Sequence, residues 1–140
     1  MAEGSWRNEY AIIAYDKVRY SDTDRQGHVN NTVFAAFLET GRVEVLYNPE
    51  DPLFAGDAEF VIVASNLNLE GEIHWPGTVD IGTRVARLGN SSITLEQVLF
   101  QEDKRVASAQ TVLVQINSAT RKAQALSDRS RSRLEALMNK

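Results

Sequence analysis

The chain has 140 residues, of which 43% are hydrophobic and 24% charged, and it contains no cysteine. This length suits one compact domain over residues 1–140, and the lack of cysteine excludes disulfides, zinc–thiolate sites, iron–sulfur clusters and a cysteine nucleophile. The 15 basic and 19 acidic side chains give a net charge of −4, the wrong sign for a general nucleic-acid binder. The sequence has no signal-peptide pattern and no apolar stretch of membrane-spanning length, so we expect a cytoplasmic protein without a nucleic-acid or membrane partner.

Two elements are predicted in the first third of the chain. Residues 11–20 are rich in Ile, Tyr and Val and predict a strand. Over residues 31–47 the apolar positions recur at helical spacing and predict a long helix with one buried stripe: Phe34, Phe37, Leu38, Gly41 and Val45. Asn30 is the expected N-cap, and Pro49 ends the helix because the residue before a proline avoids helical backbone. Gly41 predicts a close approach of the sheet backbone to this helix.

After a loop over residues 48–57, the chain is strand-like as far as Asn117, and no second helix interrupts it. The run 60–64 is apolar on both faces, so this part of its strand must be covered on both sides. Alternating patterns predict three further strands, separated by turns that we interpret as hairpins at residues 76–77, 89–91 and 101–104. Residues 127–140 predict a short helix or a loose tail.

The order of these elements predicts the fold class. A strand, one long helix and four long antiparallel strands indicate an α+β domain in which a curved sheet of about five strands wraps the helix. Such a sheet has exposed edge strands, which favour dimerisation by edge pairing.

The loop Tyr20–Asn31, between the first strand and the helix, concentrates the polar chemistry of the chain. Turn formation and helix capping explain these residue types without catalysis, so composition alone leaves both interpretations open. The position of the loop favours catalysis, because free N–H groups at a helix start stabilise a developing oxyanion. On a loop bent by Gly27, Asp24 would face the same carbonyl carbon as a nucleophile or as a base on water.

The segment 18–45 contains a specific motif, Tyr-x-Asp-x-Asp-x-x-Gly-His-Val-Asn-Asn-x-x-Phe-x-x-Phe-x-Glu-x-x-Arg. This motif resembles that of the hotdog-fold thioesterases related to 4-hydroxybenzoyl-CoA thioesterase. A weaker similarity continues through Trp75-Pro76 and the turn at 84–92 to Asn117, and the order of elements also matches. The resemblance implies a hotdog fold, hydrolysis of acyl-CoA thioesters without a cofactor, and a homodimer or homotetramer.

The resemblance also implies a role for each residue of the loop. Asp24, three residues before Gly27, takes the position of the catalytic carboxylate. The backbone N–H near Asn31, in the first helical turn, takes that of the oxyanion donor. His28 and Asn30 line the cavity beside Gly27, and His28 assists the attacking water or protonates the thiolate that leaves.

The form Gly-His-Val-Asn-Asn is similar to that of long-chain acyl-CoA thioesterases and of plant acyl carrier protein thioesterases. The plant enzymes use Asp-x-Asn-x-His at these positions, whereas this chain has Gln26 between Asp24 and His28. The plant Asp–Asn–His mechanism therefore does not carry over, while the role of the aspartate does. Acyl-CoA is the expected substrate, and acylated carrier protein is the second candidate.

An acyl-CoA carries several phosphate charges, so a protein of net charge −4 must gather basic groups locally to bind it. We expect Arg87, with Ser91 and Ser92, to provide this site. His28 and His74 lack metal-ligand spacing, so no metal site is predicted, and His74 is interpreted as a turn residue.

Other candidates and functions stay open. Asp22 is interpreted as structural, and Glu39, which is spaced to pair with Arg42, is the reserve catalytic carboxylate because a related hotdog subgroup uses a helix glutamate. A hotdog enoyl-CoA hydratase would instead use Asp24 and His28 to move a proton beside the carbonyl. A non-catalytic module that binds acyl-CoA or acyl carrier protein would bind without turnover.

Overall fold

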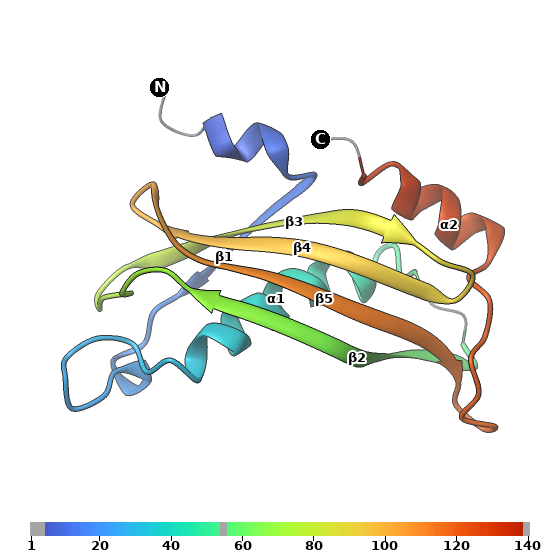
Figure 1. Cartoon of the computed structure of the whole chain (residues 1–140), viewed down its shortest axis with the longest axis horizontal. Coiled ribbons are helices and arrows are strands. Elements are labelled where there is room, and N and C mark those ends of the chain that lie inside the picture. Colours follow the sequence, from blue (N-terminus) through green and yellow to red (C-terminus); the bar gives the residue numbers. More distant parts are fainter. Residues whose placement is uncertain (1–4, 54–55, 139–140) are drawn as a thin grey trace.

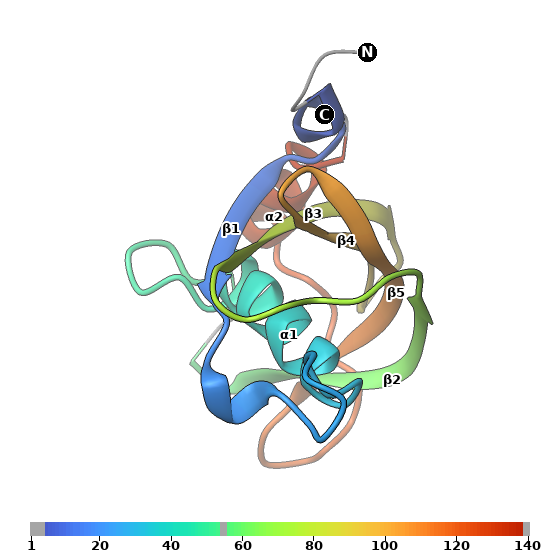
Figure 2. The same ribbon diagram turned by 90° about the vertical axis from the view of Figure 1, so that its left-hand side faces the viewer.

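The computed structural model describes residues 5–53 and 56–138. In these residues a five-stranded antiparallel sheet curves around one long helix, α1 (Val33–Leu46) (Figures 1 and 2). The strands are β1 (Ile12–Lys17), β2 (Ala58–Leu69), β3 (Thr78–Leu88), β4 (Ser92–Gln101) and β5 (Lys104–Asn117). Two short 3₁₀ helices, η1 (Ser5–Glu9) and η2 (Tyr20–Asp22), flank β1, and α2 (Asp128–Glu135) follows the sheet. This α+β arrangement confirms the predicted hotdog fold.

The strand order is β1-β3-β4-β5-β2, so β1 and β2 form the two edges of the sheet. The turns after β3 and β4 are hairpins, as predicted, and Glu102 and Asp103 both have the positive φ that a tight two-residue hairpin requires. The Pro76-Gly77 turn is not a hairpin, because β2 pairs with β5 and β3 pairs with β1. That prediction was wrong because turn residues indicate where a strand ends and not which strand it pairs with.

The start of α1 also differs from the prediction. The N-cap position is occupied by Thr32, which makes no side-chain cap, and Asn30 lies two residues earlier. The Asn30 side-chain oxygen accepts from the Thr32 N–H at 3.0 Å, and its carbonyl accepts from the Val33 N–H at 2.9 Å. Asn30 therefore shapes the turn before the helix rather than capping it. The helix ends at Leu46, just before Asn48-Pro49, as predicted.

The buried stripe of α1 is the one that the periodicity predicts, together with Leu46. Near the helix start it packs on Val79, Ile81 and Leu99, and near the helix end it packs with Leu134 of α2. The helix therefore has its first turns at one end of the sheet, where the loop after β1 also lies (Figures 1 and 2).

Gly41 allows the closest contact between helix and sheet. A Cβ at this position would lie 2.6 Å from Ile81 Cγ2, 2.8 Å from Gln97 Nε2 and 2.9 Å from Thr83 Oγ1. The prediction of a close approach is correct, but side chains and not sheet backbone fill the space. The buried Gln97 amide uses that space to donate to Leu38 O at 3.0 Å and to Thr83 Oγ1 at 2.9 Å.

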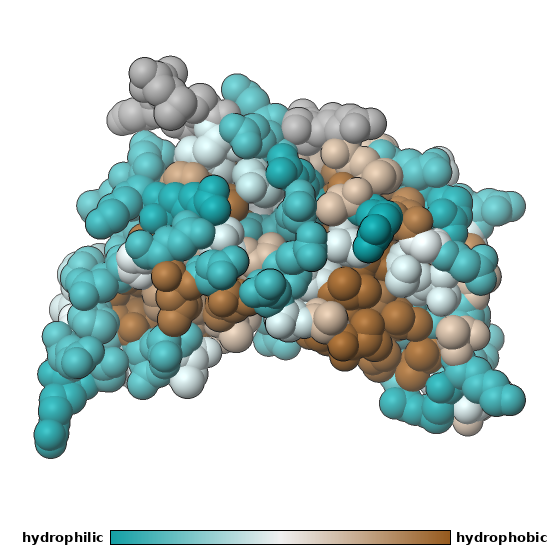
Figure 3. Space-filling model, viewed as in Figure 1, coloured by the Kyte–Doolittle hydropathy of each residue, from teal (hydrophilic) through white to brown (hydrophobic). Residues whose placement is uncertain are grey.

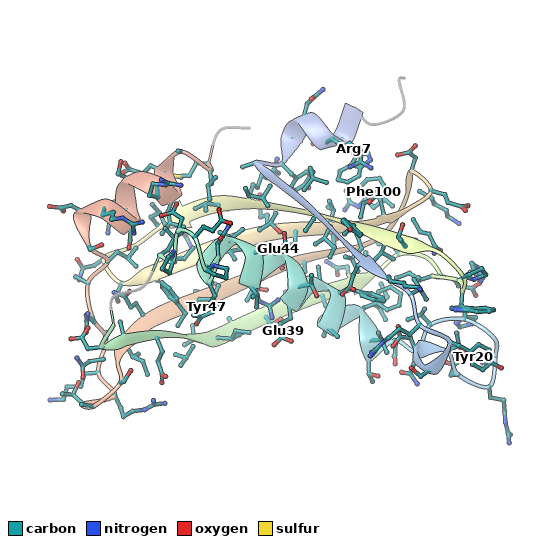
Figure 4. The ribbon with its side chains drawn as sticks, turned by 180° about the vertical axis from the view of Figure 1, so that it is seen from behind. Arg7, Tyr20, Glu39, Glu44, Tyr47 and Phe100 are labelled. Atoms are coloured by element: carbon teal, nitrogen blue, oxygen red, sulfur yellow. The ribbon has the colours of Figure 1, made fainter. Side chains whose placement is uncertain are left out.

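The face of the sheet opposite α1 carries a separate apolar cluster near the N-terminal segment. Trp6 stacks on Phe100 with ring centroids 4.0 Å apart, and Tyr10 packs beside them. Arg7, which Figure 4 shows near Phe100, pairs with Asp80 at 2.9 Å. Within the described part of the chain, no helix has the length and apolar character needed to cross a bilayer.

Candidate active site

The loop between β1 and α1 folds into a small closed turn. Thr23 and Val29 form an isolated antiparallel bridge, and the Asp24 N–H donates to His28 O at 3.0 Å. The Gly27 N–H donates back to Asp24 O at 3.0 Å, and the φ of 87° at Gly27 explains why glycine stands there. This turn brings the Asp24 and His28 segments side by side.

Buried contacts hold the turn in place. Asp22 is 3% exposed, and its carboxylate accepts from the Arg19 backbone N–H at 2.8 Å and from Arg19 Nη2 at 2.9 Å. The Asp22 carbonyl accepts from the Asn30 N–H at 2.9 Å, and the Val29 N–H donates to Ile73 O at 2.8 Å. Asp22 is therefore structural, as its spacing from Asp24 indicated.

A cavity of about 350 Å³ opens beside this turn. Its wall combines the loop, the start of α1 and the segment after β2, and is lined by Asp24, Gln26, His28, Val29, Asn31, Phe34, Leu69, Gly71 and Glu72. The structure therefore brings together the three predicted catalytic positions. It adds Glu72, Leu69 and Gly71, which lie 38 or more positions after Asn31 in the sequence and carry no motif that would have identified them.

The Asp24 carboxylate is half-buried, and one of its two oxygens accepts a hydrogen bond. Its Oδ1 accepts from the Gln26 N–H at 2.9 Å, which fixes the orientation of the side chain. The second oxygen has no hydrogen-bond donor among the residues that the structure describes. A carboxylate oxygen in this state is available to attack an electrophile or to accept a proton from water.

The amides before α1 differ in whether they already have acceptors. The Asn30 N–H donates to Asp22 O. The Thr32 N–H donates to Asn30 Oδ1, and the Val33 N–H donates to Asn30 O. The Asn31 N–H, at the cavity wall, has no acceptor within residues 5–53 and 56–138. It lies two residues before the helix and not in its first turn as predicted, but still beside the positive end of the helix dipole.

His28 and Glu72 are neighbours in the cavity wall. The distance from His28 Nε2 to Glu72 Oε2 is 3.5 Å, and His74 Nε2 lies at the same distance from Glu72 Oε1. The two imidazole rings meet edge to face, with centroids 6.3 Å apart. His74, which was interpreted as a turn residue only, therefore lies next to the candidate site.

The predicted phosphate-binding residues lie elsewhere in the chain. Arg87 is near the end of β3, and Ser91 and Ser92 are at the turn into β4. Nine residues of extended strand separate Arg87 from Thr78, at the cavity end of β3, which is about 30 Å. A single copy of the chain does not bring these three residues to Asp24, and their role in substrate binding stays a prediction.

Glu39, the reserve carboxylate, belongs to a different cavity of about 190 Å³ that it shares with Arg42 and Tyr47. Burial lowers the pKa of the Arg42 guanidinium, and the Glu39 carboxylate partly opposes that shift. Figure 4 shows Glu39 midway along α1, well away from Tyr20 at the start of the loop. Among the described residues, no group of three or more His, Cys, Asp or Glu side chains is arranged to hold a metal ion.

Comparison with known proteins yields consistent relatives. A family model described as the thioesterase superfamily matches residues 26–108. The long-chain acyl-CoA thioesterase FadM of Escherichia coli (strain K12) is 32% identical over 126 residues, which is 87% of this chain and 96% of that protein. The crystal structure of the PA5185 protein of Pseudomonas aeruginosa superposes with a TM-score of 0.84 at 30% identity and covers 95% of both chains. A predicted thioesterase of Bacillus stearothermophilus superposes with a TM-score of 0.82 at 26% identity, over 90% of this chain and 95% of that one.

Proposed function

The chain belongs to the thioesterase superfamily, and from this premise we propose that it hydrolyses acyl-CoA thioesters to a free acid and coenzyme A in the cavity beside Asp24. The observation that carries this proposal concerns two groups in one cavity wall. Within the described parts of the chain, one Asp24 carboxylate oxygen has no hydrogen-bond donor and the Asn31 amide has no acceptor. A nucleophile or base and an oxyanion donor are the two groups that acyl transfer requires.

The proposed reaction follows from these two groups. The thioester carbonyl oxygen accepts the Asn31 N–H, which stabilises the negative charge that develops on it. The free oxygen of Asp24 then attacks the carbonyl carbon, the C–S bond breaks, and water hydrolyses the resulting anhydride. Alternatively, Asp24 takes a proton from a water molecule that attacks directly. In both routes the leaving thiolate gains a proton, which His28 donates in this proposal.

The apolar side of the cavity supports an apolar acyl group as substrate. Val29 and Phe34 are buried in the core, while Leu69, at the end of β2, is 49% exposed and open to a ligand. Polar groups gather at the loop side of the same cavity. This separation suits a thioester whose carbonyl lies at the loop and whose acyl chain runs toward β2.

The experiment compares release of free thiol from saturated acyl-CoAs, an enoyl-CoA and an acylated carrier protein. Because the protein has no cysteine, a thiol reagent detects released coenzyme A without background from the enzyme. A thioesterase releases thiol from the saturated substrates. A hydratase would add water to the enoyl-CoA without releasing thiol, and a binding module would bind these ligands without turnover.

We propose in addition that two copies of the chain pair along β2. Residues 60–69 of this edge strand carry no charge, and Ile62, Val63 and Leu69 are 49%, 59% and 49% exposed. Figure 3 shows apolar side chains gathered over the region where β5 and β2 lie side by side. The other edge strand, β1, is half as long and ends in Asp16-Lys17, charges that discourage pairing.

Val63→Lys should convert the dimer into a monomer, because a charged side chain on an edge strand opposes pairing with a second copy. Light scattering coupled to gel filtration measures the mass. Tyr15→Lys on β1 is the matched control, since Tyr15 is 70% exposed, and it should leave the dimer intact. A monomeric wild type, or dissociation by Tyr15→Lys alone, contradicts the proposal.

Antiparallel pairing along β2 would also give Arg87 access to the substrate. It places the end of the partner that carries Arg87 beside the cavity end of the first copy. The partner's β3 would then lie four strand spacings from the first copy's β2, which is about 19 Å. The pantetheine arm of coenzyme A separates the thioester from the phosphates and would span this gap. Ser91 and Ser92 would lie one strand nearer, at the start of β4.

Arg87→Ala should therefore raise KM for acyl-CoA about 3- to 10-fold and leave kcat unchanged, since an exposed charge pair contributes modestly to binding. Steady-state kinetics at low and moderate salt measure both constants. Arg87→Lys keeps the charge and should restore most of the affinity. An unchanged KM in Arg87→Ala would remove Arg87 from the binding site.

A further inference from the structure

Two histidines from different segments converge on one carboxylate at the candidate active site. His28 belongs to the loop before α1, whereas Glu72 and His74 follow β2. One oxygen of Glu72 lies 3.5 Å from His28 Nε2 and the other lies 3.5 Å from His74 Nε2. Glu72 also lines the cavity that contains Asp24. His28 and His74 are the two histidines of the chain, and both contact this one side chain.

The backbone that carries these side chains is held by hydrogen bonds on both sides. The Val29 N–H donates to Ile73 O at 2.8 Å, which joins the residue after His28 to the residue after Glu72. The side chain of Gln101 accepts from the His74 N–H at 2.9 Å and donates to His74 O at 2.8 Å. The three side chains therefore project from positions that are fixed relative to one another.

Stability does not account for this arrangement. Glu72 and His74 are each 60% exposed, and pairs exposed to this degree contribute little to the free energy of folding. His28 is the less exposed partner, at 24%, and the one that faces the substrate cavity. The contact that matters is consequently the one between Glu72 and His28.

A carboxylate beside Nε2 has a defined effect on a histidine. It accepts the Nε2–H, so that the neutral ring keeps its lone pair on Nδ1, and it stabilises the ring when Nδ1 takes up a proton. The separation of 3.5 Å exceeds that of a normal hydrogen bond, and such contacts shorten when substrate fills a site. Glu72 is 60% exposed, so its side chain has room to rotate toward His28.

We propose that Glu72 is the positioning residue for His28, and that His74 holds the second oxygen of Glu72 so that the carboxylate stays aimed at the imidazole. This inference rests on the proposed thioesterase function, since it concerns proton transfer by His28 in that reaction. In this proposal Glu72 acts through the orientation and charge of His28.

The test replaces Glu72 by glutamine, which keeps the shape of the side chain and removes its charge. We expect kcat for acyl-CoA hydrolysis to fall roughly 10- to 100-fold, with KM and thermal stability unchanged. In a His28→Gln background the same substitution should have no further effect, because its partner is absent. His74→Gln should lower kcat by a smaller factor, roughly 2- to 5-fold, since it removes only the contact that holds the second oxygen of Glu72.

Glu70→Gln is the matched control at the same end of the sheet. Glu70 pairs with Arg105 at 2.7 Å and accepts from Ser108 Oγ at 2.7 Å, and it does not line the cavity. Its replacement should leave kcat unchanged. If the wild type releases thiol and Glu72→Gln keeps its kcat, or loses as much in the His28→Gln background, the inference is overturned. If the wild type releases no thiol, the proposed function itself fails, and the inference fails with it.

Discussion

Replacing Asp24 by asparagine is expected to lower kcat for thioester hydrolysis by at least about 10³-fold, because the side chain loses the oxygen that attacks the carbonyl or activates water. Asparagine has the same shape and keeps an oxygen that can accept from the Gln26 N–H, so the turn should remain folded. Steady-state release of free coenzyme A measures the loss, and thermal unfolding confirms that the variant is intact. His28→Gln should be less damaging, since general acid–base assistance supplies only part of the rate.

Glu39→Gln is the informative companion to this variant. Glu39 lies in a separate cavity and should be dispensable for the chemical step. If Asp24→Asn kept full activity while Glu39→Gln lost it, the helix carboxylate would be the catalyst and the site assigned to the loop would be wrong.

Gly41→Val should strongly destabilise the fold. A Cβ at this position would lie within 3.0 Å of Ile81, Gln97 and Thr83, and two of these side chains are β-branched and therefore stiff. Relief of the clash requires the Gln97 amide to give up its bonds to Leu38 and Thr83. We expect the free energy of unfolding to fall by about 3 kcal/mol, measured by urea denaturation.

Gly56→Val provides the control for this prediction, because none of the residues that the structure describes lies within 4 Å of a Cβ built at Gly56. It should change stability by less than about 0.5 kcal/mol. A Gly41→Val variant as stable as Gly56→Val would contradict the tight packing of α1 on β3 and β4.

Periodicity predicted the elements of the fold well because it reports local burial. The buried stripe from Phe34 to Val45 and each alternating strand depend on residues within a short stretch of sequence. Strand pairing depends instead on contacts between distant segments, which is why Pro76-Gly77 was misread as a hairpin. Asn30 was predicted as the N-cap of α1, whereas Thr32 occupies that position. The prediction was wrong because Asn favours both a helix cap and the turn before a helix.

The residues of the candidate site were likewise predictable only where they lie close together in the sequence. Asp24, His28 and Asn31 lie within eight residues, so a single loop motif predicts that they meet. Glu72 and His74 reach the site only because the segment after β2 is hydrogen-bonded to the loop through Val29 and Ile73, and no local pattern reveals that contact. Arg87 illustrates the converse, because a correct strand prediction did not show that the strand carries it away from the cavity.

The most direct test of the catalytic account is a crystal structure of Asp24→Asn with an intact acyl-CoA bound. We predict that the carbonyl oxygen lies about 3 Å from the Asn31 amide nitrogen, with the carbonyl carbon about 3–3.5 Å from the side chain at position 24 or from a water molecule held by it. A thioester bound beside Glu39, or a carbonyl turned away from both groups, would contradict the central claim.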